Sequence, residues 1–327
     1  MRRSFLHVVE RCDNFRPVDT LEHLYAFALS SNSKSESVVG LIRPNVLAAI
    51  NDDNLASSHQ ASFVIDSTAQ RLSFASHITT PEDRSNVIAD LCARWRSHGL
   101  FSDVIGGRLW RNELYAVYAN PFGQRTAGSA AFTMERSACA LFGVITYGVH
   151  MTIYHPPVAD NEEVKIWVPK RAATKQTWPG YLDNSVAGGI PAGEQVFDTI
   201  IKESMEEASI TEHTVRAHAR SVGAISYFYR TEKGYLQPEV EFVYHMAVPL
   251  HEQEAFQLKP LDGEVESFAL MSISDVISNM HEGKFKPNCA VVLLDFLIHH
   301  GHVTPDNEPH FLEITTRMHG RFDFDRW

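Results

Sequence analysis

Apolar residues of the C-terminal half form short runs rich in β-branched and aromatic side chains. Such runs predict strands, and they occupy residues 144–155, 164–171, 224–230 and 240–248. Two later stretches, residues 272–283 and 288–301, instead predict helices. Because single helices follow strands, the pattern indicates a mixed sheet with helices on its faces.

The residues before this region mix helices and strands less regularly. The clearest helix begins at Thr80, which precedes Pro81 in the first turn, and it ends near Gly99. We also expect strands at residues 62–67 and 108–120 and a helix over residues 133–143. The chain is therefore predicted to divide into a smaller α+β domain at residues 1–140 and a second domain at residues 141–327.

Composition narrows the functional classes. The chain has 327 residues, 44% of them hydrophobic, and a formal net charge of −11. An acidic protein lacks the basic face of a general nucleic-acid binder, although a few local Lys and Arg residues can still bind phosphate. Without a run of about 18 apolar residues, we expect no membrane span. Four cysteines without a C-x-x-C pair suggest free thiols in a reducing compartment. We therefore expect a cytoplasmic location, and the two early arginines leave a mitochondrial one open. No feature indicates an oligomeric state.

One short stretch, GGIPAGEQVFDTIIKESMEEASI at residues 188–210, sets like charges side by side. A helix is expected at roughly residues 195–208, with an apolar stripe that packs on the sheet. Glu203, Glu206 and Glu207 fall on the opposite arc at i,i+3 and i,i+4 spacing, where like pairs cost roughly a few tenths of a kcal/mol each. The helix dipole also disfavours negative charge near a C-terminus. Stability alone does not explain these residues.

The simplest interpretation of these glutamates is a solvated acidic face, but the preceding loop favours a binding site. Gly188, Gly189 and Gly193 allow the backbone to approach a ligand closely, and Glu194 adds a fourth carboxylate. Oxygen ligands suit Mg²⁺ or Mn²⁺, which bind alongside substrate phosphates. We therefore expect a divalent cation and a small-molecule diphosphate substrate here.

The stretch resembles the signature of the Nudix hydrolases, G-x5-E-x7-R-E-U-x-E-E-x-G-U, where U is a bulky aliphatic residue. Every acidic position of the signature is present at the expected spacing. Lys202 replaces the usual Arg, Ser204 an aliphatic residue and Ser209 the usual Gly. Lys keeps the charge but lacks the bidentate fork of Arg. The resemblance implies an α/β/α sandwich and metal-assisted cleavage of a diphosphate.

Further segments are similar to one Nudix subgroup, which is related to the N-terminal part of fungal thiamine pyrophosphokinase. They lie at residues 110–118, 135–143, 147–155, 165–189 and 262–272. That subgroup carries an extra N-terminal domain. The resemblance implies cleavage of thiamine diphosphate, and of its oxidised oxo- and oxythiamine forms, to the monophosphate and phosphate, a metabolite-repair activity.

The family implies a role for each signature residue. Glu203, Glu206 and Glu207 would hold the Mg²⁺ or Mn²⁺ with the backbone carbonyl of Gly188. Glu194 would orient the ligands through Lys202. The general base is expected from a later loop, and the order of candidates is Glu264, Glu266 and then Glu203 itself.

Substrate contacts are expected just before the signature. Lys170, Arg171 and Lys175 could bind the diphosphate, since guanidinium and ammonium groups pair with phosphate oxygens. Trp167 and Trp178 are candidates for stacking on a thiamine ring. An ordinary core role for the aromatic residues, and a solvated basic loop for the cations, are the alternatives.

Three other functions keep part of this pattern. The substrate could be a nucleoside diphosphate derivative such as ADP-ribose, because the signature reads only the diphosphate and the metal. The chain could be a diphosphate-binding module without catalysis. It could also be an isopentenyl-diphosphate isomerase, but neither Cys139 nor Cys289 matches the motif of that enzyme.

Overall fold

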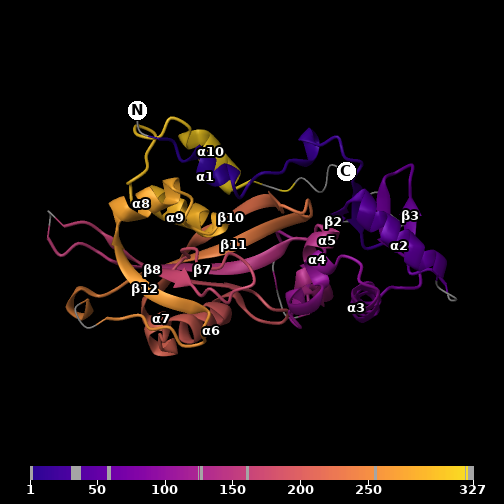
Figure 1. Cartoon of the computed structure of the whole chain (residues 1–327), viewed down its shortest axis with the longest axis horizontal. Helices are drawn as coiled ribbons and strands as arrows, with labels where there is room; N and C mark the ends of the chain where they lie inside the picture. The colour runs from indigo at the N-terminus through magenta and orange to yellow at the C-terminus, as the bar shows by residue number, and fades with distance from the viewer. Residues whose placement is uncertain are drawn as a thin grey trace.

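The computed structural model describes residues 3–30, 38–56, 60–123, 125, 128–159, 162–253, 256–320 and 322. Two units lie side by side along the long axis of the molecule (Figure 1). Within the described residues, no helix combines the length and apolar character needed to cross a membrane. All four cysteines are buried and carry free thiols.

The N-terminal unit is built on a four-stranded sheet with the order β2-β1-β4-β3. Its elements are β1 (Tyr25–Ala28), β2 (Val38–Ile42), α2 (Pro44–Ala56), β3 (Phe63–Asp66), β4 (Arg71–Phe74), α3 (Pro81–Ser97) and α4 (Ser102–Ile105). A separate antiparallel hairpin of β5 (Leu114–Tyr118) and β6 (Ala130–Glu135) precedes α5 (Cys139–Phe142). Helix α3 begins at Pro81, as the Thr-Pro pair predicts, and a capping box between Thr80 and Asp83 closes its first turn.

The helix predicted over residues 133–143 is correct only at its end. Residues 133–135 continue strand β6, residues 136–138 form a 3-10 turn, and α5 ends at Gly143, whose φ is +55°. Pairing with β5 buries Phe132 and Met134 in the N-terminal core, and this tertiary contact overrides the local helical pattern. The strand predicted over residues 108–120 begins only at Leu114.

The C-terminal unit contains a six-stranded mixed sheet with the order β10-β11-β7-β8-β12, and β9 pairs with β7. The strands are β7 (Thr146–His155), β8 (Lys165–Arg171), β9 (Val186–Gly189), β10 (Ala219–Arg230), β11 (Leu236–Ala247) and β12 (Val265–Ser272). Strands β7 and β11 run parallel, and the other pairs are antiparallel. The four strand runs predicted for this half are all present.

Helices cover both faces of this sheet, which confirms the predicted α/β/α arrangement. The helices are α6 (Val196–Ala208), α7 (Glu212–His218), α8 (Ile273–His281) and α9 (Pro287–His299). Figure 1 shows α6 and α7 on one side of the sheet and α8 and α9 on the other. Apolar residues of α6 share a core with β7, whereas α9 packs with β8 on the opposite face.

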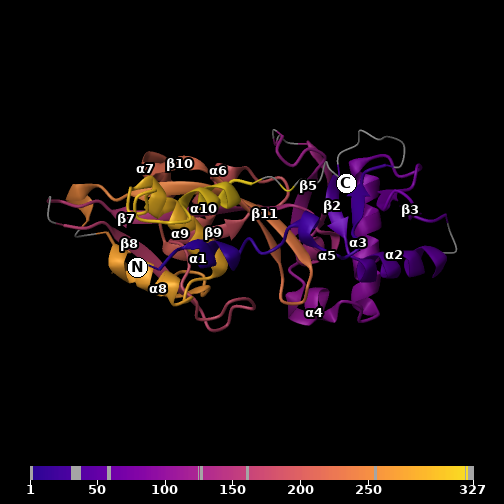
Figure 2. The same ribbon diagram turned by 90° about the horizontal axis from the view of Figure 1, so that it is seen from above.

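The first helix lies with the C-terminal unit. Helix α1 (Leu6–Glu10) contacts α9 and α10 (Phe311–Met318), and Phe5, Val8 and Val9 belong to the α9 core. Figure 2 shows α1 beside α9 and α10, away from α2 and α3. Helix α1 therefore packs on the C-terminal unit, although the residues that follow it in sequence form the N-terminal unit. The division at residue 140 stays a prediction.

Candidate active site

Strand β9 and helix α6 bring the glycine-rich stretch back against the sheet. Gly188 and Gly189 pair with Val149 and Gly148 of β7. Helix α6 begins at Val196 and buries Ile200 and Ile201 in the core below the sheet. Both the helix and its apolar stripe agree with the sequence analysis.

The three glutamates of α6 occupy different environments. Glu206 is exposed and Glu203 is half-buried, but Glu207 is buried at 8% exposure. The helical pattern placed Glu207 away from the core, and that part of the prediction is wrong. Strand β9 covers this residue, and the backbone N–H of Ala187 donates to Oε2 of Glu207 at 3.0 Å.

Gly188 leaves the space that Glu203 occupies. A Cβ atom at position 188 would lie 2.3 Å from Cδ and 2.5 Å from Cγ of Glu203. A real side chain does not approach so closely, so only glycine lets this carboxylate lie over the strand. The carboxylate and the Gly188 backbone are thus held next to each other.

The α6 glutamates lack ion-pair partners among the described residues. Burial and the charge of Glu206 raise the pKa of Glu203 to about 7. Burial, together with the charges of Asp183 and Glu203, raises the pKa of Glu207 well above its ordinary value. Among the described residues, none of the three α6 glutamates forms an ion pair with Lys, Arg or His. A bound cation would relieve this repulsion.

The donor set fits a hard divalent cation that is shared with a substrate. No group of three or more His, Cys, Asp or Glu side chains in the described part of the chain is arranged as a complete metal site. Mg²⁺ is usually held by one or two carboxylates and completes its octahedron with waters and substrate phosphates. Glu203, Glu206 and the Gly188 carbonyl supply oxygen ligands of the required kind.

Glu194 and Lys202 form an ion pair beside the glutamates. Lys202 Nζ lies 3.2 Å from Oε1 of Glu194, and the hydroxyl of Thr199 lies 3.3 Å from Oε2. Burial alone would lower the pKa of Lys202, but its hydrogen bond to Glu194 raises it overall. The predicted orienting role of this pair stays a prediction.

The predicted general base lies near the site. The charge of Glu264 contributes to the raised pKa of Glu203, and its side chain pairs with Lys175. The backbone carbonyl of Glu264 accepts from Ala172 N at 2.9 Å. Lys175 therefore lies at the rim of the carboxylate cluster, between the loop before β9 and the loop before β12.

The other predicted substrate contacts are engaged elsewhere. Arg171 is buried, pairs with Asp183, and donates to the carbonyls of Thr177 and Trp178 at 3.0 and 3.1 Å. It braces its own loop and offers no free guanidinium group. Exposed Lys170 pairs with Glu266 at 2.9 Å.

The two tryptophans lie in different environments, and a stacking role for Trp178 stays a prediction. Trp167 is buried in the core beneath the sheet, and its Nε1 donates to His155 Nε2 at 3.0 Å. Its position does not allow it to stack on a ligand. Trp178 is half-buried, has a φ of +53°, and contacts Tyr181 edge to face.

Sequence analysis missed two residues of the N-terminal unit, Tyr115 of β5 and Arg136 of the 3-10 turn that follows β6. A Cβ atom at Gly189 would lie 1.5 Å from Oη of Tyr115 and 3.4 Å from Cζ of Arg136. The positive charge of Arg136 counteracts the raised pKa of Glu203, and its guanidinium stacks on Tyr115 and pairs with Glu113 at 2.8 Å. No spacing in the sequence indicates this approach; only the family-like segments that contain both residues could have suggested it.

Comparison with known proteins agrees with this geometry. Residues 4–146 match a family described as a domain of unknown function (DUF4743), and residues 150–290 match the NUDIX domain. The uncharacterized protein YJR142W of Saccharomyces cerevisiae is 36% identical over 98% of this chain and 92% of its own length. Two proteins of Arabidopsis thaliana are also similar. Nudix hydrolase 20, chloroplastic, is 35% identical over 74% of this chain and 59% of its own length. Nudix hydrolase 24, chloroplastic, is 29% identical over 96% and 77%.

Proposed function

We propose that this chain, a pyrophosphohydrolase that belongs to the Nudix hydrolase family, cleaves thiamine diphosphate and its oxidised forms to the monophosphate and phosphate. The observation that carries the proposal is the set of α6 carboxylates without counter-cations beside Gly188. The thiamine assignment rests on the similarity of the flanking segments to one subgroup.

In this proposal Glu203, Glu206, Glu207 and the Gly188 carbonyl hold Mg²⁺ or Mn²⁺. When bound, the ion neutralises charge that develops on the diphosphate oxygens. Burial of Glu207 fixes one carboxylate, and its hydrogen bond from Ala187 ties helix α6 to strand β9. The ligands are therefore preorganised before the substrate arrives.

Two carboxylates compete for the role of general base. The charge of Glu264 acts on Glu203, and Lys175 binds only its Oε2, so its other oxygen could accept a proton from the attacking water. Glu203 is the alternative because it lies against Gly188 within the same cluster of carboxylates. Glu264→Gln should lower kcat by roughly 100-fold or more if Glu264 is the base. A nearly unchanged kcat would move the role to Glu203.

Lys175 and Arg136 are the cations proposed to bind the diphosphate. Both influence the α6 carboxylates, since the charge of Lys175 counteracts the raised pKa of Glu207 and that of Arg136 does so for Glu203. Arg171 is not included because its donors are already bound inside the protein.

A substrate panel tests the proposal. Purified protein with Mg²⁺ would be given thiamine diphosphate, oxothiamine diphosphate, ADP-ribose and a dinucleoside polyphosphate, and phosphate or monophosphate release would be measured. We expect the thiamine compounds to have the highest kcat/KM. Rapid cleavage of ADP-ribose without turnover of either thiamine compound would reject the substrate assignment and favour the nucleoside alternative.

The variant Glu206→Gln is the control for contaminating phosphatases, because it alters an exposed residue and should leave the fold intact. Binding of a diphosphate without turnover in the unmodified protein would support the non-catalytic module. The proposed location remains cytoplasmic, on the basis of composition and free thiols.

A further inference from the structure

We propose that a pocket between the β5–β6 hairpin and the β9–α6 loop binds the organic part of the substrate. It selects an uncharged planar ring that offers a hydrogen-bond acceptor to Arg125. The proposal rests on the proposed function, because it concerns the group attached to the diphosphate.

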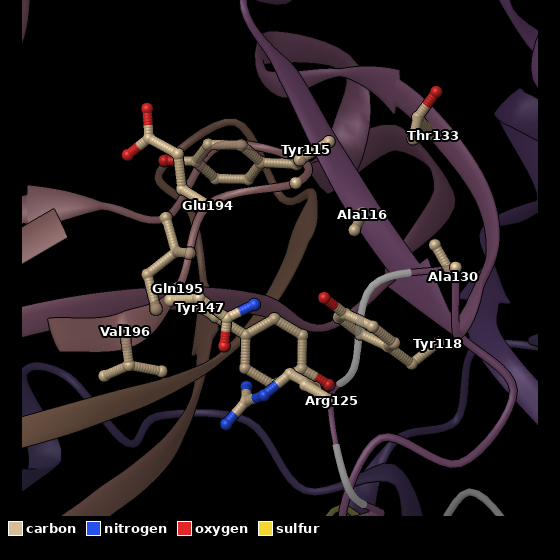
Figure 3. A pocket seen from close by; sticks show the side chains of 14 residues that line it. Tyr115, Ala116, Tyr118, Arg125, Ala130, Thr133, Tyr147, Glu194, Gln195 and Val196 are labelled. Carbon is tan, nitrogen blue, oxygen red and sulfur yellow. The ribbon is translucent and has the colours of Figure 1, made fainter. Parts of the chain in front are cut away.

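Both units of the protein line this pocket. Tyr115, Tyr118 and Arg125 come from the N-terminal hairpin and its loop, whereas Tyr147 and Glu194 come from β7 and the loop before α6. Figure 3 shows these side chains around a common space, with the Arg125 guanidinium beside the Tyr147 ring. Neither unit alone would enclose this space.

The pocket adjoins the carboxylate cluster through Tyr115 and Glu194. Tyr115 Oη lies against the α-carbon of Gly189, and the next residue, Gly188, lies against Glu203. Glu194 belongs to the pocket wall and also pairs with Lys202 of α6. A ligand whose diphosphate lies on the α6 glutamates can therefore extend its other end into the pocket.

Arg125 is held in place by aromatic rings rather than by a carboxylate. Its Cζ atom lies 4.2 Å from the ring centroid of Tyr147 and 4.1 Å from that of Phe242. The Tyr147 ring is fixed in turn, because its hydroxyl donates to the Pro121 carbonyl at 2.9 Å. Stacking on two rings orients the guanidinium plane.

One of these N–H groups has no partner. Nη1 of Arg125 is buried and makes no hydrogen bond within the described residues, and no carboxylate among them forms an ion pair with Arg125. A buried donor without an acceptor is costly, so such atoms in native proteins generally have a reason. A carbonyl oxygen or ring nitrogen of a bound ligand would satisfy it.

The walls define the rest of the ligand. Tyr118 and Tyr147 meet edge to face, with centroids 5.6 Å apart and planes at 79°, and such walls suit a flat ring. A fixed, partly desolvated guanidinium repels a second positive charge. Glu194 does not cancel that charge, because it is paired with Lys202. The pocket therefore favours a neutral ring over a cationic one.

The test compares Arg125→Met and Arg125→Lys with the unmodified enzyme on three diphosphates. Oxothiamine diphosphate has a neutral ring with a carbonyl, thiamine diphosphate has a cationic ring, and methyl diphosphate has no ring. We expect both variants to raise KM for oxothiamine diphosphate about tenfold or more while kcat changes little. KM for methyl diphosphate should not change. KM for thiamine diphosphate should change less than KM for oxothiamine diphosphate, and in Arg125→Met it could fall because a positive charge has been removed.

Arg96→Met is the matched control, because Arg96 also stacks on an aromatic ring of the N-terminal unit, with Cζ 4.7 Å from the Trp110 ring, but does not line the pocket. It should keep the KM of the unmodified enzyme for all three substrates. Thermal unfolding checks that each variant is folded. If Arg125→Met unfolds early, Arg125→Lys carries the test, since it keeps the charge and loses the fork.

A metal-free titration separates this proposal from the proposed function. Phosphate-free oxothiamine and thiamine would be titrated into the unmodified protein and Arg125→Met by calorimetry. Oxothiamine binding that weakens about tenfold in Arg125→Met supports the pocket even if no diphosphate is hydrolysed. Two results would refute the pocket proposal without affecting the proposed hydrolase activity. One is that all variants cleave the diphosphates with the KM of the unmodified enzyme, and the other is that KM for methyl diphosphate rises as much as KM for oxothiamine diphosphate.

Discussion

Gly188→Ala should lower activity strongly while leaving the fold nearly unchanged. The added Cβ would lie 2.3 Å from Cδ of Glu203, whereas ordinary contact begins at 3.4 Å, so the carboxylate must move by about 1 Å. Its side chain is long and half-buried and can make this movement at little cost. The backbone at position 188 is not in the left-handed region, so alanine adds no backbone strain.

The expected loss follows from the displacement. A misplacement of about 1 Å in a catalytic group costs on the order of 100-fold in rate, which corresponds to about 2.7 kcal/mol of transition-state stabilisation. The free energy of unfolding should change by less than about 1 kcal/mol. Steady-state kinetics with Mg²⁺ and denaturant unfolding measure the two quantities separately.

A double-mutant cycle with Glu203→Ala tests the reason for the loss. If Gly188→Ala acts only by displacing Glu203, the double variant should be no slower than Glu203→Ala alone. Gly320→Ala is the matched control, because a Cβ there would meet its nearest atom at 3.6 Å. Full activity of Gly188→Ala, or additive losses in the cycle, would refute the argument.

Three further predictions concern the metal ligands, Arg171, and the buried ion pair of Glu241 with His150. Glu206→Gln and Glu207→Gln should each lower kcat/KM roughly several hundredfold, or about 3.5 kcal/mol. EDTA should stop the unmodified enzyme until Mg²⁺ or Mn²⁺ is restored, and unchanged rates in the two variants would exclude the metal role. Arg171→Leu should lower the free energy of unfolding by about 3–5 kcal/mol, because it leaves Asp183 buried without its partner. Normal denaturant unfolding with a raised KM would instead place Arg171 on the diphosphate. Burial alone would raise the pKa of Glu241, but the charge of His150 and the hydrogen bonds from His150 and Tyr227 lower it from 4.5 to about 2. Its contribution to stability is therefore complete above about pH 4.5 and lost as the pH falls towards 2. Denaturant titrations at several pH values in this range should show that Glu241→Gln makes the free energy of unfolding depend less on pH. The same pH dependence in the variant and the unmodified protein would contradict the role of Glu241.

The clustering of the α6 carboxylates was predictable because its signal is local. Three carboxylates at i,i+3 and i,i+4 spacing after a glycine-rich loop lie within one helix, so their proximity needs no tertiary information. The burial of Glu207 was not predictable from the helix pattern. It depends on strand β9, which folds over the residue and supplies the Ala187 N–H.

The basic residues show the opposite case. Arg171 is close to the signature in sequence, but Asp183 and two carbonyls occupy its guanidinium. Arg136 is distant in sequence, yet the packing of the two units brings it beside Gly189, where an added Cβ would lie 3.4 Å from its Cζ atom. Closeness along the chain therefore does not decide which cation lies at the carboxylates, because neither the partner of Arg171 nor the position of Arg136 follows from a local pattern.

The departures from the signature are accommodated by neighbouring residues. A bidentate Arg would serve both oxygens of Glu194. Here Lys202 Nζ takes one oxygen, and the hydroxyl of Thr199 lies 3.3 Å from the other while it also lies 3.0 Å from the Gln195 carbonyl. Glu194 thus keeps a cation on one oxygen, whereas its other oxygen shares the single Thr199 proton with the Gln195 carbonyl.

The exit from helix α6 is accommodated in a similar way. Ser209 adopts the left-handed conformation that a glycine would take, with φ of +57°, and its N–H caps Ser204. Its hydroxyl donates to the Lys259 carbonyl at 2.8 Å. A hydrogen bond of this kind contributes about 0.5–1.5 kcal/mol, which offsets the roughly 1–2 kcal/mol cost of the left-handed backbone. Because both substitutions leave the α6 carboxylates in position, they are no reason to regard the chain as a binding module that has lost catalysis.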